Sequence, residues 1–394
     1  MCSFIVIGVS DAHEVTFGQE LADRIKRARV CSGGKRHHAL VEHLLAEDAE
    51  WIDVTVPLGE VFEKYRQIDG EIVVFASGDP LFFGYAATLQ REFPDAKIEV
   101  HPYFNSLQTL AHRMVLPYQE MRCVSLTGRP WHDFYTALIN GERLIGVLTD
   151  RVRTPQTIAQ RMLEYGYSNY LMTIGENLGS QTNERVTTIS IEEASKMDFM
   201  SLNCVILTRT SERKHPFGIS DMEFAHLNGR EKMITKMPIR LLALSMLEIN
   251  NRKSLWDIGF CTGSVSIEAK LQAPHLFINA FEIRKESKKL FETNTRRFGT
   301  PGIDCHIGNF LEQDLTSLPA PDAVFIGGHG GKLCEIVGRI KQVLQPGGVI
   351  VFNSVSKASL DMFEQSVKIN GMKVVRRHTV QLDAFNPITV MQAK

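Results

Sequence analysis

A run of ten residues in the second half of the chain has the residue types and spacing of a nucleotide-type binding loop. It reads Leu255-Trp256-Asp257-Ile258-Gly259-Phe260-Cys261-Thr262-Gly263-Ser264. We expect a strand that ends near Gly259, a short turn, and a helix that begins near Ser264. Such a turn brings backbone N–H groups and a helix N-terminus against a ligand at the carboxyl end of the first strand.

Glu282 supplies a second part of this predicted site, because it lies 23 residues after Gly259, at the end of the next apolar run. A carboxylate there can accept hydrogen bonds from both hydroxyls of a ribose. The G-x-x-T-G loop and the two β-rich runs that close the chain favour S-adenosylmethionine over a nicotinamide dinucleotide. The structural alternative is that Gly259 and Gly263 only form a tight turn and that Glu282 only caps a strand.

Two later loops extend the predicted second-half site. Asn309 and Phe310 follow the third expected strand, where an Asn amide can pair with an adenine edge. A glycine-rich loop at 327–332 follows the fourth, and there His329 and Lys332 can bind carboxylates. An ordinary turn at Asn309 and a merely flexible glycine loop are the competing interpretations.

A similar strand-to-loop junction occurs in the first half, where the apolar run 72–75 leads into Ala76-Ser77-Gly78-Asp79-Pro80-Leu81-Phe82-Phe83-Gly84. Gly-Asp-Pro sets a turn, and we expect a helix over 82–92 beside it. Further junctions lie at Asp150 and Glu176, where plain connections explain the residues equally well. Basic residues also gather earlier in the chain, close to His37 and His38. A solvated helix face explains most of them, although a polycarboxylate ligand would need a few: Arg24, Lys26, Arg27, Arg29, Lys35 and Arg36.

The alternation of short apolar runs with helix-length segments predicts an α/β fold with parallel strands. We expect one two-lobed domain over 1–208 with a ligand between its lobes, because two successive sets of strands occur there. Residues 209–232 are polar with little periodicity, which predicts a linker. Residues 233–394 predict a second, Rossmann-like domain that ends in an antiparallel strand pair.

The composition limits the classes of function. Forty-four Lys and Arg against 45 Asp and Glu leave a net charge of −1, so no global field attracts nucleic acid or an acidic membrane. Seven scattered cysteines without a C-x-x-C pair argue against a disulfide framework and a zinc site. The first ten residues lack the features of a signal peptide, and no run approaches the roughly 18 apolar residues of a membrane span. We therefore expect a cytoplasmic protein without a metal.

These motifs resemble those of the precorrin-6Y C5,15-methyltransferase (decarboxylating) family, the fused enzymes of cobalamin biosynthesis, over nearly the whole chain. The first half is similar to the tetrapyrrole methylases, and the second half to the partner that methylates C15 and decarboxylates. The first similarity rests on segments 77–84, 125–129, 147–150 and 175–179, and the second on 234–236, 256–259, 262–268 and 323–328.

The resemblance implies S-adenosylmethionine as cofactor, a precorrin as substrate, with or without cobalt, and methyl transfer to C5 in the first domain. In the second it implies transfer to C15 with loss of the C12 acetate carboxyl. We also expect a homo-oligomer. His329 is the candidate for steering the acetate or moving a proton. The implied cofactor contacts are Gly78, Asp79, Pro80, Ser106 and Asp150 in the first domain, and Thr235, Gly259, Phe260, Cys261, Thr262, Gly263, Glu282, Asn309 and Phe310 in the second.

The chain departs from the family pattern at a few positions. Cys261 replaces the middle glycine of the second loop, and Asn309 replaces an aspartate. In the first domain, Tyr103-Phe104-Asn105 stands where small residues precede Ser106. Two alternatives therefore stay open: a first domain that only binds tetrapyrrole, and a tetrapyrrole carrier without enzymatic activity. A nicotinamide dehydrogenase is a third, disfavoured by the loop and the terminal strand pair.

Overall fold

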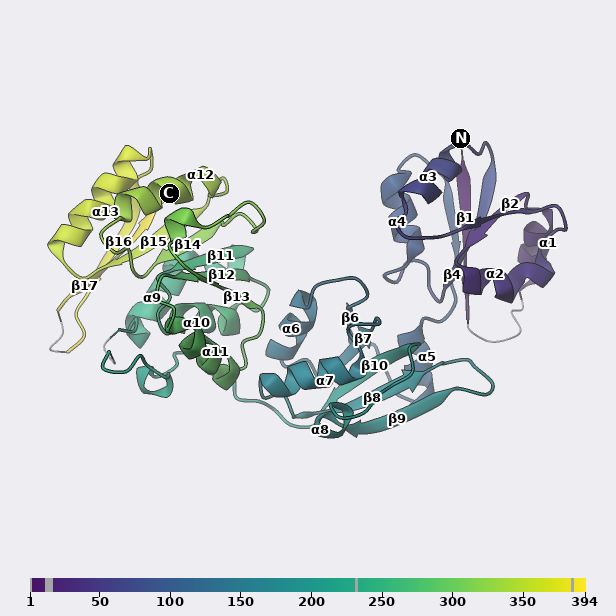
Figure 1. The fold of residues 1–394 in the computed structure, drawn as a ribbon, viewed down its shortest axis with the longest axis horizontal. Helices are drawn as coiled ribbons and strands as arrows, with labels where there is room; N and C mark the ends of the chain where they lie inside the picture. Colours follow the sequence, from purple (N-terminus) through teal and green to yellow (C-terminus); the bar gives the residue numbers. More distant parts are fainter. Residues whose placement is uncertain (1, 11–16, 231–232, 384–385) are drawn as a thin grey trace. The chain divides into compact units, whose positions relative to one another are not determined.

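The computed structural model describes residues 2–10, 17–230, 233–383 and 386–394. The chain divides into two compact units, which are described separately (Figure 1). The first comprises Met1–Arg129, Arg143–Gln160 and Tyr170–Thr210, and the second comprises Pro130–Glu142, Arg161–Asn169 and Ser211–Lys394. No helix among the described residues is long and apolar enough to cross a membrane.

The first unit begins with a parallel sheet in the order β3-β2-β4-β1-β5. Its apolar residues alternate between two faces: Phe4 and Val6 lie in one core cluster, whereas Ile5 and Ile7 lie in another. The sheet is thus buried on both sides, as predicted for parallel strands. Its elements are β1 (Ser3–Val9), α1 (Gln19–Arg27), β2 (Val30–Gly33), α2 (Lys35–Val41), η1 (Glu42–Leu44), β3 (Glu50–Asp53), α3 (Gly59–Arg66), β4 (Glu71–Ser77), α4 (Tyr85–Glu92) and β5 (Ile98–His101).

A second sheet of this unit has the order β6-β7-β10-β8-β9. Only β6 and β7 pair in parallel, and the other neighbours are antiparallel. Leu107 and Leu110 of α5 pack against Leu144 of β7 and Ile206 of β10. The elements are α5 (Ser106–Arg113), β6 (Arg122–Ser125), α6 (His132–Ile139), β7 (Leu144–Leu148), α7 (Pro155–Glu164), β8 (Tyr170–Glu176), β9 (Arg185–Ser190), α8 (Ile191–Ala194) and β10 (Asn203–Arg209), of which α6 and the end of α7 from Arg161 belong to the second unit.

The second unit is built on one sheet in the order β13-β12-β11-β14-β15-β17-β16. The first five strands are parallel, and β17 runs antiparallel to both β15 and β16, which confirms the predicted terminal strand pair. Its strands are β11 (Ser254–Ile258), β12 (Phe277–Glu282), β13 (Ile303–Ile307), β14 (Ala323–Ile326), β15 (Val349–Ser354), β16 (Val374–Val380) and β17 (Ile388–Ala393).

Helices cover both faces of this sheet, because Leu255 of β11 lies in one core cluster and its neighbour Trp256 in another. The first cluster also contains α9 and α10 residues, and the second contains α12 and α13 residues. The predicted Rossmann-like α/β class is confirmed. The helices are η2 (Asp221–Glu223), α9 (Met237–Leu247), η3 (Ile249–Asn251), α10 (Ser264–Gln272), α11 (Ser287–Phe298), η4 (Phe310–Glu312), α12 (Leu333–Val343) and α13 (Lys357–Ile369).

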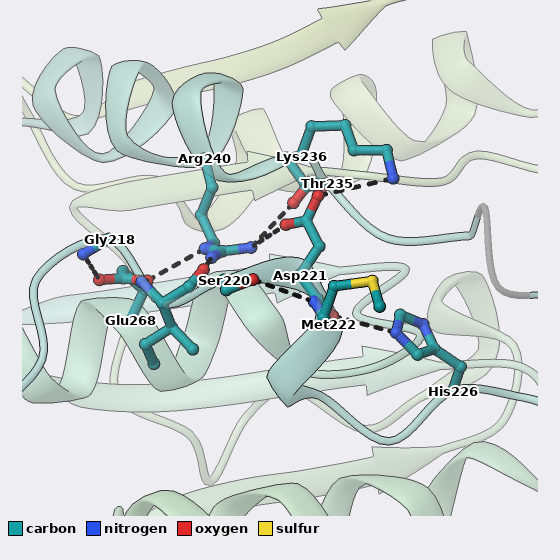
Figure 2. A network of polar contacts seen from close by, with 10 residues as sticks. Gly218, Ser220, Asp221, Met222, His226, Thr235, Lys236, Arg240 and Glu268 are labelled. Atoms are coloured by element: carbon teal, nitrogen blue, oxygen red, sulfur yellow. Dashed lines mark hydrogen bonds and ion pairs between the residues drawn. The ribbon is translucent and has the colours of Figure 1, made fainter.

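A buried ion pair anchors the segment that precedes α9 (Figure 2). Arg240 and Glu268 are both fully buried, with Nε of Arg240 3.1 Å from Oε2 of Glu268. Glu268 accepts a hydrogen bond from the backbone N–H of Gly218 at 2.8 Å, and Arg240 donates to the Thr235 carbonyl at 2.9 Å. The described part of the predicted linker, up to residue 230, therefore packs within the second unit in large part, and its Phe224 is 2% exposed.

Candidate functional sites

The first unit contains a cavity of about 560 Å³ that residues of both its sheets line. It lies at the carboxyl ends of β1 and β4, which are parallel neighbours. Gly8 must be a glycine here, because an added Cβ would overlap the carbonyl oxygen of Gly78. Gly78 itself has φ +60°, and its added Cβ would lie 2.8 Å from Cα of Asn105. Backbone approaches of this kind leave room for a ligand at the strand ends.

The structure brings three of the five predicted first-site residues to this cavity: Gly78, Asp79 and Ser106. Oδ1 of Asp79 accepts the Leu81 N–H at 2.9 Å, which closes the predicted turn. The expected helix begins at Tyr85 and not at Phe82, since Phe83 has φ +54° and Gly84 caps the helix. Pro80 is not among the residues that line the cavity.

Asp150, also predicted as a cofactor contact, does not line the cavity either, and its carboxylate holds its own loop together. Oδ1 accepts the N–H groups of Val152 and Arg153 at 2.8 and 2.6 Å. Oδ2 accepts from Gly128 N–H at 3.1 Å and from the Arg153 guanidinium at 2.8 Å. Burial alone would raise the pKa of Asp150, but these hydrogen bonds outweigh it and lower the pKa to about 2.

Several lining residues were not predicted as contacts. Thr127 and Thr149 come from the second sheet's loops, and the Thr149 hydroxyl donates to the Asn203 carbonyl at 2.6 Å. Arg36 and His37, which the sequence placed in a mostly solvated basic group, also line the cavity and contact Ser77. Pairing of β2 with β4 brings these residues together, although Arg36 and His37 precede Ser77 by 41 and 40 positions.

The second unit has a smaller cavity of about 190 Å³ at the carboxyl ends of β11, β12 and β14. Strand order reverses between β11 and β14, which is where open α/β sheets bind ligands. Gly259 has φ +77°, and its added Cβ would lie 2.6 Å from the backbone nitrogen of Gly328. The loops after β11 and β14 therefore touch through their backbones.

Glu282 lines this second cavity at the end of β12, as predicted, and is 3% exposed. Its Oε2 accepts the Cys261 N–H at 3.0 Å, and its Oε1 accepts the Ile283 and Arg284 N–H groups at 2.9 and 3.1 Å. The Arg284 guanidinium lies 3.2 Å from both carboxylate oxygens. The carboxylate thus fixes the predicted loop and already has several donors.

Asp257, on β11 directly before the 259–263 loop, is fully buried and accepts the Ser266 hydroxyl at 2.6 Å through Oδ2. Its Oδ1 is buried without a hydrogen-bond partner among the described residues. Burial, the largest cause, together with the negative charge of Glu282, raises the pKa of Asp257 to about 7 despite the Ser266 hydrogen bonds. Asp257 is not among the residues that line the cavity, so this buried carboxyl group lies behind the loop and not in contact with a ligand there.

Of the other predicted second-site residues, Gly259, Asn309, Phe310 and His329 also line the cavity. The Asn309 amide is engaged by Glu312 and by the Leu311 N–H, so it caps η4. The Phe310 ring is 6% exposed and packs edge-on against Trp256. Residues that do not line the cavity are Thr235, Phe260, Cys261, Thr262 and Gly263.

These remaining residues shape the surroundings of the loop. The Phe260 ring packs on Phe291, and Gly263, at φ +77°, caps α10. Cys261 has φ +50° and its thiol lies 3.2 Å from the Met233 carbonyl oxygen. Thr235 lies in the segment that Arg240 fixes.

His329 is partly buried, and its Nδ1 accepts the Gly331 N–H at 3.2 Å. Because Nδ1 accepts this hydrogen bond, the proton of the neutral ring lies on Nε2, and burial lowers the pKa of the ring. His329 and Lys332 both line the cavity. Among the residues that the structure describes, no group of three or more His, Cys, Asp or Glu side chains could hold a metal ion.

The comparisons with known proteins divide the chain in the same order. Residues 1–195 match the family model of tetrapyrrole (corrin/porphyrin) methylases, and residues 226–393 match that of the precorrin methyltransferase domain. A cobalt-precorrin-7 C(5)-methyltransferase of Salmonella typhimurium is 29% identical over 51% of this chain and 96% of its own length. A cobalt-precorrin-6B C(15)-methyltransferase (decarboxylating) of the same organism is 39% identical over 34% of this chain and 68% of its own.

A longer relative spans both parts. The precorrin-6Y C(5,15)-methyltransferase (decarboxylating) of a Sinorhizobium species is 33% identical over 89% of this chain and 84% of its own length. The chain is therefore a methyltransferase and belongs to the precorrin-6Y C5,15-methyltransferase (decarboxylating) family.

Proposed function

We propose that this enzyme methylates precorrin-6Y, or its cobalt form, at C5 in the first unit and at C15 in the second, where it also removes the C12 acetate carboxyl. The observation that carries the proposal is the presence of two glycine-lined cavities, one in each unit, at the carboxyl ends of parallel strands. The relatives from Salmonella support one reaction for each half, because their names divide the C5 and C15 methylations between separate proteins. They give no support to a carrier without enzymatic activity.

S-adenosylmethionine is the cofactor that we propose for both cavities, where it would supply an activated methyl group. In the first, the Gly8–Gly78 approach and the Asp79 carboxylate suit a cationic ligand with a flat base. In the second, the Gly259–Gly328 approach leaves the corresponding room. A ribose diol at Glu282 would take the place of the Arg284 guanidinium, because that group now occupies both carboxylate oxygens.

Positioning supplies most of the rate in this chemistry, because a sulfonium methyl is already activated towards an electron-rich ring carbon. The apolar walls of the first cavity, with Phe75, Phe82 and Leu148 among them, exclude water from the transfer. The backbone contact between the β11 and β14 loops holds the second cavity in a fixed shape.

Decarboxylation needs one more group, since the carbon that loses CO₂ keeps the electron pair and must receive a proton. We assign to His329 the orientation of the acetate, because its neutral ring holds a proton on Nε2 and can donate a hydrogen bond to the acetate carboxylate before CO₂ leaves. The proton that replaces CO₂ on the carbon then comes from water, either directly or through Nε2, with Nδ1 taking up a second proton from water in the same step. Mass spectrometry of the product of His329→Gln separates these steps. We expect both methyl groups to be added while the C12 acetate carboxyl is retained.

Separate mutation of the two sites tests the division of labour. Asp79→Ala is expected to abolish only the C5 methylation and Glu282→Ala only the C15 methylation, counted by mass on precorrin-6Y. Asp95→Ala, an exposed acid of the first unit, is the control. If Asp79→Ala leaves both methylations intact, the first unit only binds the tetrapyrrole. Calorimetric titration with S-adenosylmethionine alone should find two sites, and finding one would contradict the two-site proposal.

A further inference from the structure

A polar corner of the first cavity has no part in the function described so far. It forms where β2 and β4 lie side by side in parallel, so that their carboxyl ends meet at one edge of the sheet. Gly33 ends β2, and an added Cβ there would lie 3.2 Å from the Phe75 carbonyl oxygen. This close passage brings Arg36 and His37, on the first turn of α2, beside Ser77 at the end of β4.

The hydrogen bonds in this corner fix the direction of one proton. Nδ1 of His37 accepts the Gly34 N–H at 3.2 Å, so the ring proton lies on Nε2, which donates to the Ser77 hydroxyl oxygen at 2.9 Å. The Arg36 guanidinium donates to the same oxygen at 2.8 Å. Burial, with the Arg36 charge, lowers the pKa of His37 to about 4, so this arrangement is the one present at neutral pH.

The Ser77 oxygen thus accepts two hydrogen bonds, and a hydroxyl has two acceptor positions and one proton. Its own O–H therefore points away from Arg36 and His37. Ser77 is exposed and lines the cavity, and no acceptor for its proton is found among the described residues. The hydroxyl is consequently set as a donor towards a ligand, next to a guanidinium.

The charged side chains that line the first cavity indicate which class of ligand can bind beside Ser77. Among the described residues that line the cavity, Arg36 is the one permanent cation and Asp79 is the one carboxylate. Most of the remaining wall is apolar or backbone, including Phe83, Phe104 and Leu178. An anion that accepts hydrogen bonds from a guanidinium and a neighbouring hydroxyl matches a carboxylate.

We propose that Arg36, His37 and Ser77 form a carboxylate-binding subsite that orients the tetrapyrrole in the first cavity by one of its acidic side chains. This inference rests on the proposed function. Arg36 and Ser77 contact the carboxylate, and His37 is a positioning residue that sets the direction of the Ser77 proton. The subsite is separate from Asp79, so cofactor and substrate affinity should respond to different mutations.

The test uses the full chain with precorrin-6Y and measures C5 methylation, tetrapyrrole binding and S-adenosylmethionine binding. Arg36→Gln should raise KM for C5 methylation about 10-fold, as for the loss of one partly solvated, charge-assisted hydrogen bond. Ser77→Ala should raise it about 3-fold. C15 methylation in the same sample is the internal control for folding. Lys35→Gln, the adjacent exposed base that does not line the cavity, is the matched variant and should change nothing.

Esterified precorrin-6Y, which lacks the carboxylate charges, sharpens the test. Wild type and Arg36→Gln should bind it equally weakly. If wild type and Arg36→Gln prefer the acid over the ester by the same factor, Arg36 does not bind a carboxylate and the proposed subsite is wrong. A loss of S-adenosylmethionine affinity with unchanged tetrapyrrole affinity would overturn its assignment to the substrate. Failure of the wild type to methylate C5 would instead contradict the proposed function, while the binding comparison would still decide on the subsite.

Discussion

The two cavities have the same kind of backbone contact but are lined by different charged side chains. In the first, Gly8 at the end of β1 presses against Gly78 after β4, and in the second, Gly259 after β11 presses against Gly328 after β14. In the first, Arg36, Ser77 and Asp79 line a wide cavity. In the second, the carboxylate of Glu282 is already occupied by backbone N–H groups and Arg284. The backbone contact is thus the shared requirement, and the side chains distinguish the two sites.

The largest loss of activity should come from disrupting the backbone contact between Gly8 and Gly78 or that between Gly259 and Gly328. Gly8→Ala and Gly259→Ala should each abolish one methylation, C5 and C15 respectively, and leave the other. The added Cβ would collide with backbone atoms that cannot rotate away, at a local cost above about 3 kcal/mol. Mass spectrometry of the product gives the count of methyl groups.

Two glycines without a close neighbour are the controls for these variants. Gly18→Ala tests the first unit, since an added Cβ there meets nothing within 4 Å. Gly371→Ala tests the second, because it has φ +67° but likewise no neighbour, and it isolates a conformational cost of about 1 kcal/mol. Equal losses in the glycine variants and in their controls would show that the contact between loops is not required.

The next largest effect is a loss of stability on changing Glu282, whose carboxylate already accepts several hydrogen bonds. Glu282→Gln should lower the free energy of unfolding by about 3 kcal/mol, because a buried group that accepts from three backbone N–H groups and a guanidinium loses its charge. Asp79→Asn should cost below about 1 kcal/mol, since the amide oxygen can still accept the Leu81 N–H. Denaturant unfolding of both variants measures the difference. Similar costs would show that the two acids have the same structural role.

The sequence predicted the second unit better than the first, and the reason lies in strand order. β11 and β12 are consecutive in the chain and adjacent in the sheet, so the spacing from Gly259 to Glu282 correctly predicted that both line one cavity. In the first sheet, β4 lies between β2 and β1. The contact of Arg36 with Ser77 depends on this insertion, and nothing in the local sequence shows it.

Local sequence also failed to show where side chains point. Asp150 follows a strand as a ligand-binding acid would, yet it bonds to its own loop, and Arg153 three residues later was the available sign. The helix expected from Phe82 begins three residues later because the backbone at Phe83 takes a positive φ that its side chain does not predict. Fold class and cavity position therefore follow from pattern, whereas the hydrogen bonds within each site require coordinates.

The stabilities of the two units should depend on pH in opposite directions, through His37 in the first unit and Asp257 in the second. The pKa of His37 is lowered to about 4, mainly by burial, from an unfolded value of 6.5, so the unfolded chain binds more protons between these values. Stability from this group is therefore lost as pH falls from 6.5 towards 4. His37→Asn should remove about 2 kcal/mol of this acid sensitivity, and His43→Asn, an exposed histidine, should not.

Asp257 should behave in the reverse sense. Burial raises its pKa from 3.8 to about 7, so the folded second unit binds the extra proton and stability falls as pH rises through this range. Asp257→Asn keeps an acceptor for the Ser266 hydroxyl and should be more stable than wild type at pH 8 by about 2 kcal/mol, but not at pH 4. Unfolding curves at the two pH values measure this. A constant difference between variant and wild type would contradict the assigned proton.

The smallest effect is expected at Cys261, where the second loop has a side chain in place of a glycine. Cys261→Gly removes the thiol contact with the Met233 carbonyl but relieves a positive φ of +50°, and the two changes are of opposite sign. We expect a change in unfolding free energy below about 1 kcal/mol and normal C15 methylation. Cys261→Val should instead cost about 2 kcal/mol, because a β-branched residue is strained at this φ. If Cys261→Gly loses C15 methylation, the thiol contact with the Met233 carbonyl is needed to hold residues 233–236 next to the loop. The loop of the second site would then depend on a side-chain contact, whereas Gly8 and Gly78 of the first site meet through backbone atoms.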